Sequence, residues 1–358
     1  MQCTVLHLLG TAQPEGAGIA RIVAALATGL DPAKYQLHAW FLGPPGPLAS
    51  ELRAQGVNVR ELHWDHGARD PVGAWKFWRR LRAENFSLVH QHFGGRAPAW
   101  IARTATGSPL IKHVWGNVYE AADDVHPIHC RAHGADAVIS TSRSVDEWVS
   151  GANRTVVYPG VPVPNGSTAV HARRDGSQQI VIGAAGRLVP MKGFVHLIRA
   201  MELLRKEFPE VRLEIAGDGP LCSQLQREAT RLGLDSHVTF LGWQTEIGTL
   251  FERWDVYVQP SIIEPFGIAA LEAMAAGLPV IATSGSGLAE VVADGITGWL
   301  APPGDPTALA ERLRQLLVNP AQRKQMGAAG QDRAREHFST GRMVTSISRI
   351  YESLLASR

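Results

Sequence analysis

The sequence predicts an α/β protein with two doubly wound parallel-sheet domains in tandem. Three observations support this fold class. Short runs rich in β-branched residues alternate with helix-like stretches from end to end. Many of these runs are continuously apolar, as strands are when a parallel sheet is covered on both faces. The chain has 358 residues, which is more than one hydrophobic core usually serves.

The first half of the chain contains seven candidate strands with helix-like segments between them. The strands are expected at 4–10, 36–43, 57–62, 87–92, 110–115, 135–141 and 155–160. Residues 17–30 ("AGIARIVAALATGL") and 142–151 ("SRSVDEWVSG") are typical of the intervening helices. This alternation predicts an N-terminal domain over residues 1–165.

A segment rich in Pro, Gly, Ser and charge then interrupts the pattern at 161–178 ("VPVPNGSTAVHARRDGSQ") and indicates a linker. The alternation restarts with strands expected at 180–186, 211–217, 237–242, 256–261 and 279–283. We therefore expect a second domain over 175–338, with a C-terminal helix at about 340–358 packing back on the first domain. Ligands are expected at the carboxyl ends of the strands, in a cleft between the domains.

Composition narrows the class of protein. The net charge is +2, from 35 Lys and Arg against 33 Asp and Glu, which argues against a nucleic-acid partner. No apolar run reaches the ~18 residues that a membrane helix needs. The three cysteines are scattered and form no disulfide framework. These features favour a cytoplasmic protein.

Two cations follow the first strand of the second half, and a helix follows the fourth. Arg187 and Lys192 come directly after 180–186, and a helix expected at about 266–276 follows "IIEPFG", with Pro265 in its first turn and Gly277 at its end. Two fixed cations beside a helix N-terminus can hold a diphosphate without a metal. Because the chain has no Asp-x-Asp, we expect no metal ion and no other cofactor.

Two carboxylates lie in the apolar stretch 261–283, at Glu264 and Glu272. A buried carboxylate without a partner costs several kcal/mol, so such groups usually have a task. Glu272 lies two helical turns on and can reach paired ribose hydroxyls, while Glu264 precedes the helix and faces the group on the other side of the phosphates. The alternative is that Arg187 and Glu264 form a structural ion pair and Glu272 is an exposed helix residue.

These motifs resemble the retaining, nucleotide-sugar-dependent glycosyltransferases of family 4, which have the GT-B fold of two Rossmann-like domains facing a central cleft. The matching stretches of the second half are "GRLVPMKGF", "IAGDGP", "VTFLG" and "EPFGIAALEAMAAGLPVIAT", in which Glu264 and Glu272 form the E-x7-E pair. The first half adds "GAGIARIVAALATGL", "VHQHFGG", "KHVWG", "ADAVISTSRSV" and "VVYPGV" in the same order.

The resemblance implies transfer of a sugar from a nucleotide diphosphate, most often UDP or GDP, to a hydroxyl acceptor with retention of configuration. It also implies that the domain over 1–165 binds the acceptor and the domain over 175–338 binds the donor. Such a reaction belongs to cell-envelope, polysaccharide, glycolipid or glycoside biosynthesis. Arg187 and Lys192 would neutralise the donor diphosphate, Glu272 would hold the ribose, and Glu264 would contact the transferred sugar. Backbone amides near the sugar would come from Phe266, Gly267 and Ile268.

In the first half, the resemblance places Gly16 and Gly18 in a loop that approaches the donor phosphate. His113 would lie over the reacting face of the sugar, and His92 and Trp115 are candidates for the acceptor site. The sequence departs from the family at "VPVPNG" and at "EGAGIAR", both toward the first domain, so the acceptor stays unidentified.

Other functions compete with this interpretation. A zinc site is one alternative, because His126, His129, Cys130 and His133 have helical spacing and H-x-H occurs at 90–92. An NAD-type dehydrogenase is disfavoured, since arginine replaces the third glycine of G-x-G-x-x-G. Another alternative is a module of the same fold that binds a sugar nucleotide but catalyses no reaction. An inverting transferase would give the opposite anomer.

The segment 75–82 ("WKFWRRLR") mixes aromatic and basic residues on an expected helix. Such a helix can bind an anionic membrane surface, which suits a lipid-linked acceptor at the inner face of the membrane. The alternative is an ordinary surface helix that packs Phe77, Trp78 and Leu81 inward and exposes its charges.

Overall fold

The structure is a computed structural model of the chain. It describes residues 2–13, 17–64, 70–92, 95–116, 118–121, 124–132, 134–151, 153–164 and 179–357. The contacts divide the chain into two compact units. Unit 1 comprises Met1–Gly116, His129–Gly160 and Thr340–Arg358, and unit 2 comprises Asn117–Ile128 and Val161–Ser339. The boundaries expected at 165 and 175 lie outside the described residues.

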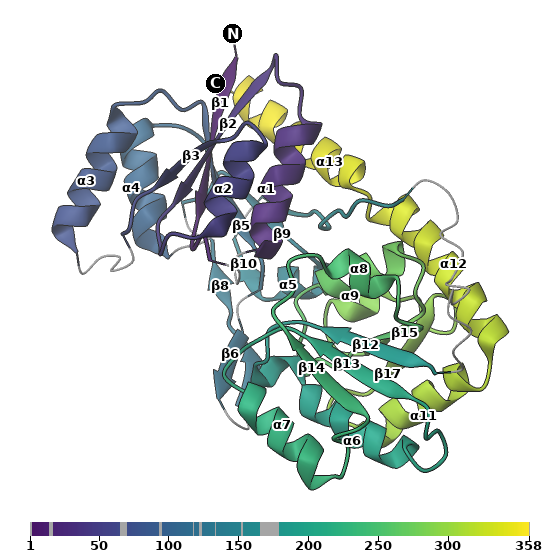
Figure 1. Cartoon of the computed structure of the whole chain (residues 1–358). Coiled ribbons are helices and arrows are strands. Elements are labelled where there is room, and N and C mark those ends of the chain that lie inside the picture. Colours follow the sequence, from purple (N-terminus) through teal and green to yellow (C-terminus); the bar gives the residue numbers. More distant parts are fainter. Residues whose placement is uncertain are drawn as a thin grey trace. The chain divides into compact units, whose positions relative to one another are not determined.

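Unit 1 contains a seven-stranded parallel sheet in the order β11-β9-β5-β4-β1-β2-β3 (Figure 1). The strands are β1 (Cys3–Leu9), β2 (Tyr35–Phe41), β3 (Asn58–Glu61), β4 (Leu88–Gln91), β5 (Leu110–Val114), β9 (Ala137–Ser140) and β11 (Arg154–Val156). The order reverses between β1 and β4. In doubly wound sheets, ligands bind outside the carboxyl ends of the strands at such a reversal.

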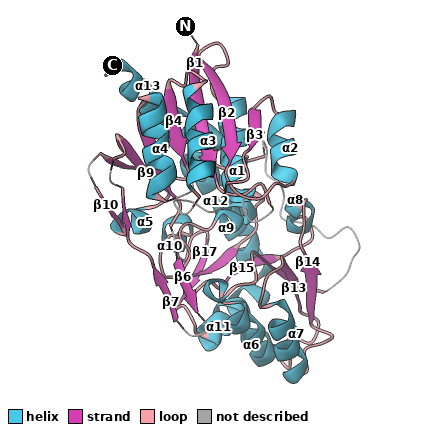
Figure 2. Cartoon of the chain, turned by 90° about the vertical axis from the view of Figure 1, so that its left-hand side faces the viewer, coloured by secondary structure: helices cyan, strands magenta, loops and turns pink. Residues whose placement is uncertain are grey.

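Helices cover both faces of this sheet (Figure 2). One face packs against α1 (Ala17–Gly29), α2 (Pro47–Ala54) and the C-terminal helix α13 (Thr340–Ala356). The other face packs against α3 (Pro71–Arg82) and α4 (Arg96–Thr106). Side chains alternate along β1, so Val5 and Leu9 pack with α1 and α13 while Leu6 and Leu8 pack with α3 and α4. A short helix, α5 (Arg143–Glu147), follows β9.

Unit 2 contains a six-stranded parallel sheet in the order β14-β13-β12-β15-β16-β17, which reverses between β12 and β15. The strands are β12 (Val181–Ala185), β13 (Arg212–Ala216), β14 (Val238–Gly242), β15 (Val256–Gln259), β16 (Val280–Thr283) and β17 (Gly298–Ala301). The connecting helices are η3 (Pro190–Lys192), α6 (Phe194–Leu204), α7 (Cys222–Arg231), α8 (Ile247–Phe251), α9 (Ile268–Ala275), α10 (Leu288–Val291), α11 (Pro306–Leu317) and α12 (Pro320–His337). The predicted fold class, two doubly wound parallel-sheet domains, is confirmed.

One segment differs from the sequence expectation. Residues 126–133 were expected to present a helical face, but the described part of this segment contains β7 (Asp124–Pro127) and β8 (Cys130–Arg131). Strand β6 (Val118–Ala121) pairs antiparallel with β7, and β8 pairs with β10 (Val149–Ser150). Proline at 127 disfavours helical backbone at the preceding residue, which explains the strand. The helical zinc site is therefore wrong, and His133 lies outside the described residues.

Helix α3 contains the aromatic and basic segment 75–82. It buries Phe77 and Leu81, half-buries Trp78, and leaves Trp75 55% exposed. Arg79 lies over the Trp75 ring at 5.4 Å and Arg82 over the Trp78 ring at 5.2 Å. The expected helix is confirmed. Among the described helices, none combines the length and the apolar character needed to cross a membrane.

Candidate functional site

Two loops meet at the strand reversal of unit 2, one after β12 and one after β15. The β12 loop carries Arg187 and ends in η3, whose last residue is Lys192. Gly193 has φ of +62°, and a Cβ atom there would lie 2.2 Å from the carbonyl oxygen of Pro260. Glycine therefore lets the loops touch. The amide of Ile262 also donates to the carbonyl of Met191 at 2.7 Å, which fixes the β15 loop against η3.

A buried ion pair joins these loops. The Nζ of Lys192 donates to Oε2 of Glu264 at 2.6 Å, and the two side chains are 20% and 8% exposed. The same carboxylate oxygen accepts from the hydroxyl of Ser261 at 3.0 Å. Two donors on one buried oxygen stabilise its charge, because hydrogen bonds to ionised groups are the strong ones. Lys192 and Glu264 thus form a rigid charged pair at the end of β15.

A chain of polar side chains supports Glu264 from within the sheet. Gln259 donates from Nε2 to the Ser261 hydroxyl at 3.0 Å. The hydroxyl of Tyr257 lies 2.7 Å from Oε1 of Gln259 and 3.1 Å from the carbonyl of Ala185 on β12. Burial raises the pKa of Tyr257 well above its usual value, so this group keeps its proton. These residues position the carboxylate, and the sequence analysis missed them. Polar residues at alternate positions of an apolar strand were the available signal.

The backbone around Glu264 is held by the loop after β16. The amide of Glu264 donates to the Ser286 hydroxyl at 2.8 Å, and the Gly287 amide donates to the Glu264 carbonyl at 2.9 Å. Ser286 adopts φ of +63°, an uncommon conformation for a side-chain-bearing residue. Strained backbone of this kind tends to occur at functional sites.

Helix α9 begins directly after the β15 loop, at Ile268, so Pro265 precedes the helix and is not in its first turn, contrary to expectation. Gly267 stands at the N-cap with φ of +100°, and among described residues no side chain caps the helix. The N-terminus of α9, where Phe266, Gly267 and Ile268 lie, therefore has the positive dipole end that favours an anion. The helix ends at Ala275, and Gly277 follows with φ of +87°.

The structure distinguishes the two cations. Lys192 is the partner of Glu264, so the alternative Arg187–Glu264 ion pair is wrong. Arg187 is exposed, and its guanidinium makes no hydrogen bond or ion pair with any described residue. Glu272 is half-buried on α9, where its charge helps to raise the pKa of Tyr257. An exposed cation, a fixed ammonium and a helix N-terminus together can bind an anion such as a diphosphate.

A cavity of about 740 Å³ in unit 2 adjoins these loops, because Pro190, Gly193 and Ile262 are among its lining residues. Apolar residues of η3, α6 and α7 line it together with His196, Arg199 and Gln224. None of the predicted donor residues lines this cavity. We therefore locate the candidate site by the strand reversal and its charged side chains.

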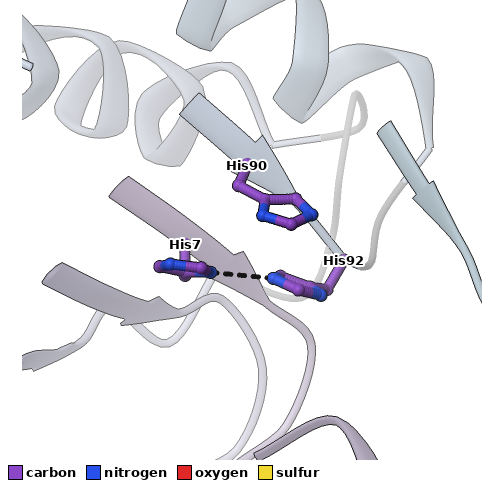
Figure 3. Close-up of side chains that lie close together, drawn as sticks. All are labelled: His7, His90 and His92. Carbon is purple, nitrogen blue, oxygen red and sulfur yellow. Dashed lines mark hydrogen bonds between the residues drawn. The ribbon is translucent and has the colours of Figure 1, made fainter. Parts of the chain in front are cut away.

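In unit 1, histidines from three neighbouring strands share the face that α13 covers. His7 on β1 is directly opposite His90 on β4, and His113 lies on β5. Nε2 of His90 lies 3.2 Å from Nδ1 of His113, and Nδ1 of His90 lies 2.6 Å from the hydroxyl of Tyr351 on α13. Nδ1 of His7 is 2.8 Å from Nε2 of His92, which follows β4 (Figure 3). The predicted His92 and His113 therefore belong to one cluster.

All four histidines are at least 96% buried, with exposures of 0%, 0%, 4% and 4% for His7, His90, His92 and His113. Burial lowers the pKa of His7 and of His113 to about 3 and lowers the pKa of the other two well below the usual value. The imidazoles are thus neutral at pH 7. Three ring nitrogens, His7 Nε2, His92 Nδ1 and His113 Nε2, are buried without a hydrogen bond among the described residues.

Trp115 stacks on His113 with ring centroids 4.3 Å apart and lies 6.0 Å from the His92 ring. The structure therefore places Trp115, His92 and His113 side by side in one candidate site. Gly18 lies near the start of α1, whereas Gly16 lies outside the described residues. The sequence analysis missed His7 and Tyr351, because neither belongs to a motif that suggests chemistry.

His7, His90 and His92 each offer a ring nitrogen within 4.8 Å of the others, the spacing of a metal site. The ring orientations do not favour one. A metal lies in the plane of each imidazole that binds it, along the nitrogen lone pair. The His90 and His92 rings are stacked at 4.2 Å with their planes 26° apart (Figure 3), so one ion cannot lie in both ring planes at bonding distance from both rings. The facing nitrogens of His7 and His92 are hydrogen-bonded to each other.

Comparison with protein families places both halves of the chain. Residues 171–333 match the family described as glycosyl transferases group 1, and residues 17–166 match the glycosyl transferase 4-like domain. The chain is 34% identical over 321 residues to D-inositol 3-phosphate glycosyltransferase of Streptomyces avermitilis, covering 79% of this chain and 68% of that protein. It is 30% identical over 339 residues to alpha-maltose-1-phosphate synthase of Mycolicibacterium smegmatis, covering 89% and 78% of the two chains.

Solved structures agree on the fold. A glycosyltransferase from Rickettsia africae superimposes with a TM-score of 0.82 over 100% of both chains, at 18% identity. Anabaena HepE in complex with UDP and glucose gives a TM-score of 0.79 over 98% of this chain and 99% of that one, at 21% identity. Both are glycosyltransferase-type structures of two parallel-sheet domains, the GT-B fold. The chain is therefore a glycosyltransferase, and it belongs to the glycosyl transferases group 1 family.

Proposed function

We propose that this glycosyltransferase transfers a sugar from a UDP- or GDP-linked donor to a hydroxyl acceptor with retention of anomeric configuration. The observation that carries the proposal is the Lys192–Glu264 pair, fixed at 2.6 Å beside the exposed Arg187 and the N-terminus of α9. This set supplies positive charge for a diphosphate and a carboxylate for sugar hydroxyls. The complexes of HepE with UDP and with UDP-glucose support a nucleotide-sugar donor.

In the proposed reaction the bond between the anomeric carbon and the diphosphate oxygen breaks. The acceptor oxygen bonds to that carbon from the same face, and its proton passes to a diphosphate oxygen. Lys192 and Arg187 stabilise the negative charge that grows on the leaving diphosphate, an effect that is usually the largest single contribution to catalysis. Glu264 contacts the sugar, Glu272 binds the ribose, and unit 1 supplies His113. No divalent ion is needed, because the two cations take its place.

We propose that the reaction belongs to cell-envelope, polysaccharide, glycolipid or glycoside synthesis. The relatives named above act on D-inositol 3-phosphate and make alpha-maltose-1-phosphate, by their names. These names support small hydroxylated molecules as the first acceptors to test.

A thermal-shift panel of UDP-, GDP-, ADP- and TDP-sugars, with and without EDTA, tests the donor proposal. We expect a UDP- or GDP-sugar to raise the unfolding temperature equally in both conditions, because the donor binds through Arg187, Lys192 and the α9 N-terminus. Arg187→Ala should weaken this shift and leave the unfolding temperature of the free protein unchanged, since the guanidinium has no partner among described residues. A shift that EDTA abolishes would contradict metal-independent binding. NMR of the product's anomeric configuration tests retention.

We also propose that α3 and α4 contact an anionic membrane surface. Val72, Trp75 and Trp100 are 60%, 55% and 68% exposed, and four basic residues of α3 lie beside them. Indole rings favour the membrane interface, and each Lys or Arg near an anionic surface contributes about 1 kcal/mol. This contact would bring the enzyme to a lipid-linked acceptor.

Co-sedimentation with phosphatidylserine vesicles tests the membrane proposal. The unmodified protein should sediment with anionic vesicles at low salt, and W75A/W100A should reduce the bound fraction severalfold. Trp243→Ala, which removes an indole that is 49% exposed in unit 2, provides the control. Equal binding by W75A/W100A and the unmodified protein would argue against these helices as the contact.

A further inference from the structure

A chain of hydrogen bonds runs from the C-terminal helix to the proposed site residue His113. Tyr351 on α13 is fully buried, and its hydroxyl lies 2.6 Å from Nδ1 of His90. Nε2 of His90 lies 3.2 Å from Nδ1 of His113. The His90 and His113 rings are nearly parallel, with an interplanar angle of 7°. The chain ends at Nε2 of His113, which has no partner among the described residues.

Counting protons leaves this chain of hydrogen bonds two possible directions. A neutral imidazole has one donor and one acceptor nitrogen, and a phenol always carries a proton to donate. If Tyr351 donates to His90 Nδ1, then His90 Nε2–H donates to His113 Nδ1, and His113 carries its proton on Nε2. In the opposite direction His90 donates to the Tyr351 oxygen, and the phenol proton has no acceptor among the described residues. Each direction leaves one buried donor without a partner among the described residues, His113 Nε2–H in the first and the Tyr351 hydroxyl in the second. The first direction is favoured because a phenol hydroxyl is a stronger donor than an imidazole N–H, and an imidazole nitrogen is a stronger acceptor than a phenol oxygen.

We infer that Tyr351 is a positioning residue, which acts through His90 to hold His113 in the Nε2–H tautomer, so that His113 serves the substrate as a hydrogen-bond donor. This inference rests on the proposed role of His113 in sugar transfer. Burial supports it, since the lowered pKa of the imidazoles and the raised pKa of Tyr351 keep every group of the chain neutral. In this role His113 cannot act as a general base through Nε2, because that nitrogen already carries a proton.

Long-range ¹H–¹⁵N spectra of ¹⁵N-histidine-labelled protein test the tautomer directly. His113→Asn identifies the His113 signals. In the unmodified protein at pH 7.5 we expect Nε2 of His113 to be protonated and Nδ1 to be unprotonated. Protonation at Nδ1 would overturn the inference without any change to Tyr351. Stoichiometric zinc in the purified protein, found by elemental analysis and lost in His7→Asn, would also overturn it, since metal ligation would then fix the rings.

Tyr351→Phe removes only the hydroxyl oxygen and its proton. We expect the His113 signals to shift toward a mixture of tautomers and kcat to fall about tenfold with little change in the donor KM, the scale of one lost hydrogen-bond preference. Tyr35→Phe is the matched control. Tyr35 is buried and meets Tyr351 edge-on at 5.9 Å, yet it contributes no atom to the hydrogen-bond chain.

The outcomes separate this inference from the proposed function. Unchanged His113 signals in Tyr351→Phe would overturn the positioning role, whatever the activity. An equal fall of kcat in Tyr35→Phe would assign the effect to packing around α13 and would overturn it as well. Lack of sugar transfer by the unmodified protein with every donor of the panel would instead count against the proposed function, and the tautomer would still be measurable by NMR.

Discussion

Lys192→Ala is expected to lower turnover by at least ~100-fold with the sugar nucleotide that the donor panel selects. The Nζ of Lys192 is held 2.6 Å from Glu264, so it can neutralise the leaving diphosphate without reorganising during the reaction. Loss of one preorganised charge donor typically costs on the order of 100- to 1,000-fold in kcat. Steady-state kinetics with saturating donor measure the effect. Near-normal turnover would remove Lys192 from the mechanism.

Controls for this variant must separate chemistry from folding. Removing Lys192 leaves Glu264, whose side chain is 8% exposed, without its cation, and breaking a buried pair typically destabilises a protein by about 3–5 kcal/mol. Thermal unfolding of each variant therefore accompanies the kinetics. Lys206→Ala removes an exposed lysine just beyond α6 and should keep full turnover. Lys192→Arg keeps the charge, so it should recover part of the lost turnover.

Acidification is expected to destabilise unit 1 steeply, beginning near pH 6.5. The pKa of His7 and of His113 is about 3 in the folded protein, and burial lowers the pKa of His90 and His92 well below the usual value. In the unfolded chain these groups return to about 6.5. Between these values the unfolded chain binds protons that the folded protein excludes. The contribution of these histidines to the free energy of unfolding is therefore fully present above pH 6.5, and it is lost as the pH falls toward 3.

Each of these histidines lowers the free energy of unfolding by about 1.4 kcal/mol per pH unit within that window. Four such groups together remove roughly 8 kcal/mol between pH 6.5 and pH 5, which is comparable with the ~5–15 kcal/mol by which whole domains are stable. Urea denaturation at pH 7.5, 6.5 and 5.5 measures the slope. Carboxylates such as Glu228, whose pKa its two arginine partners lower to about 2, act only below about pH 4.5 and leave this range to the histidines.

Two variants test the assignment of this slope. His113→Asn removes one buried imidazole and should reduce the slope by about 1.4 kcal/mol per pH unit. His337→Asn removes an exposed histidine and should leave the slope unchanged. An unfolding free energy that stays constant between pH 7.5 and 5.5 would show that the folded cluster takes up protons as readily as the unfolded chain does.

Local sequence patterns predicted most of the strands and the fold class. Apolar runs such as 180–186 and 256–261 became β12 and β15 within a few residues, because burial on both faces demands such runs. The end of α9 near Gly277 was equally predictable, since few residues other than glycine adopt its φ of +87°. The edge strand β17 was missed, because Gly298–Ala301 is short and its strand pairing depends on β16.

Partnerships between side chains were decided by the tertiary structure. The sequence places Arg187 and Lys192 in one loop with nothing to separate their roles, and the fold pairs Lys192 with Glu264 while leaving Arg187 exposed. Their distinction depends on the close contact of two loops at Gly193 and Pro260, which are 67 residues apart in number. Likewise strand β7 follows from Pro127 and from pairing with β6, although His126 and His129 have helical spacing.

By itself, the sequence determined the class of this protein: two parallel-sheet domains and a set of charged residues suited to a nucleotide sugar. Periodicity and glycine positions encode these features locally, because backbone conformation and burial act on neighbouring residues. Only the tertiary structure decided which groups touch. Strand pairing aligned His7, His90 and His113 on one face, and the return of the C-terminal helix to unit 1 brought Tyr351 to His90 across 261 residues of sequence. Contacts of that separation leave no periodic trace in the chain.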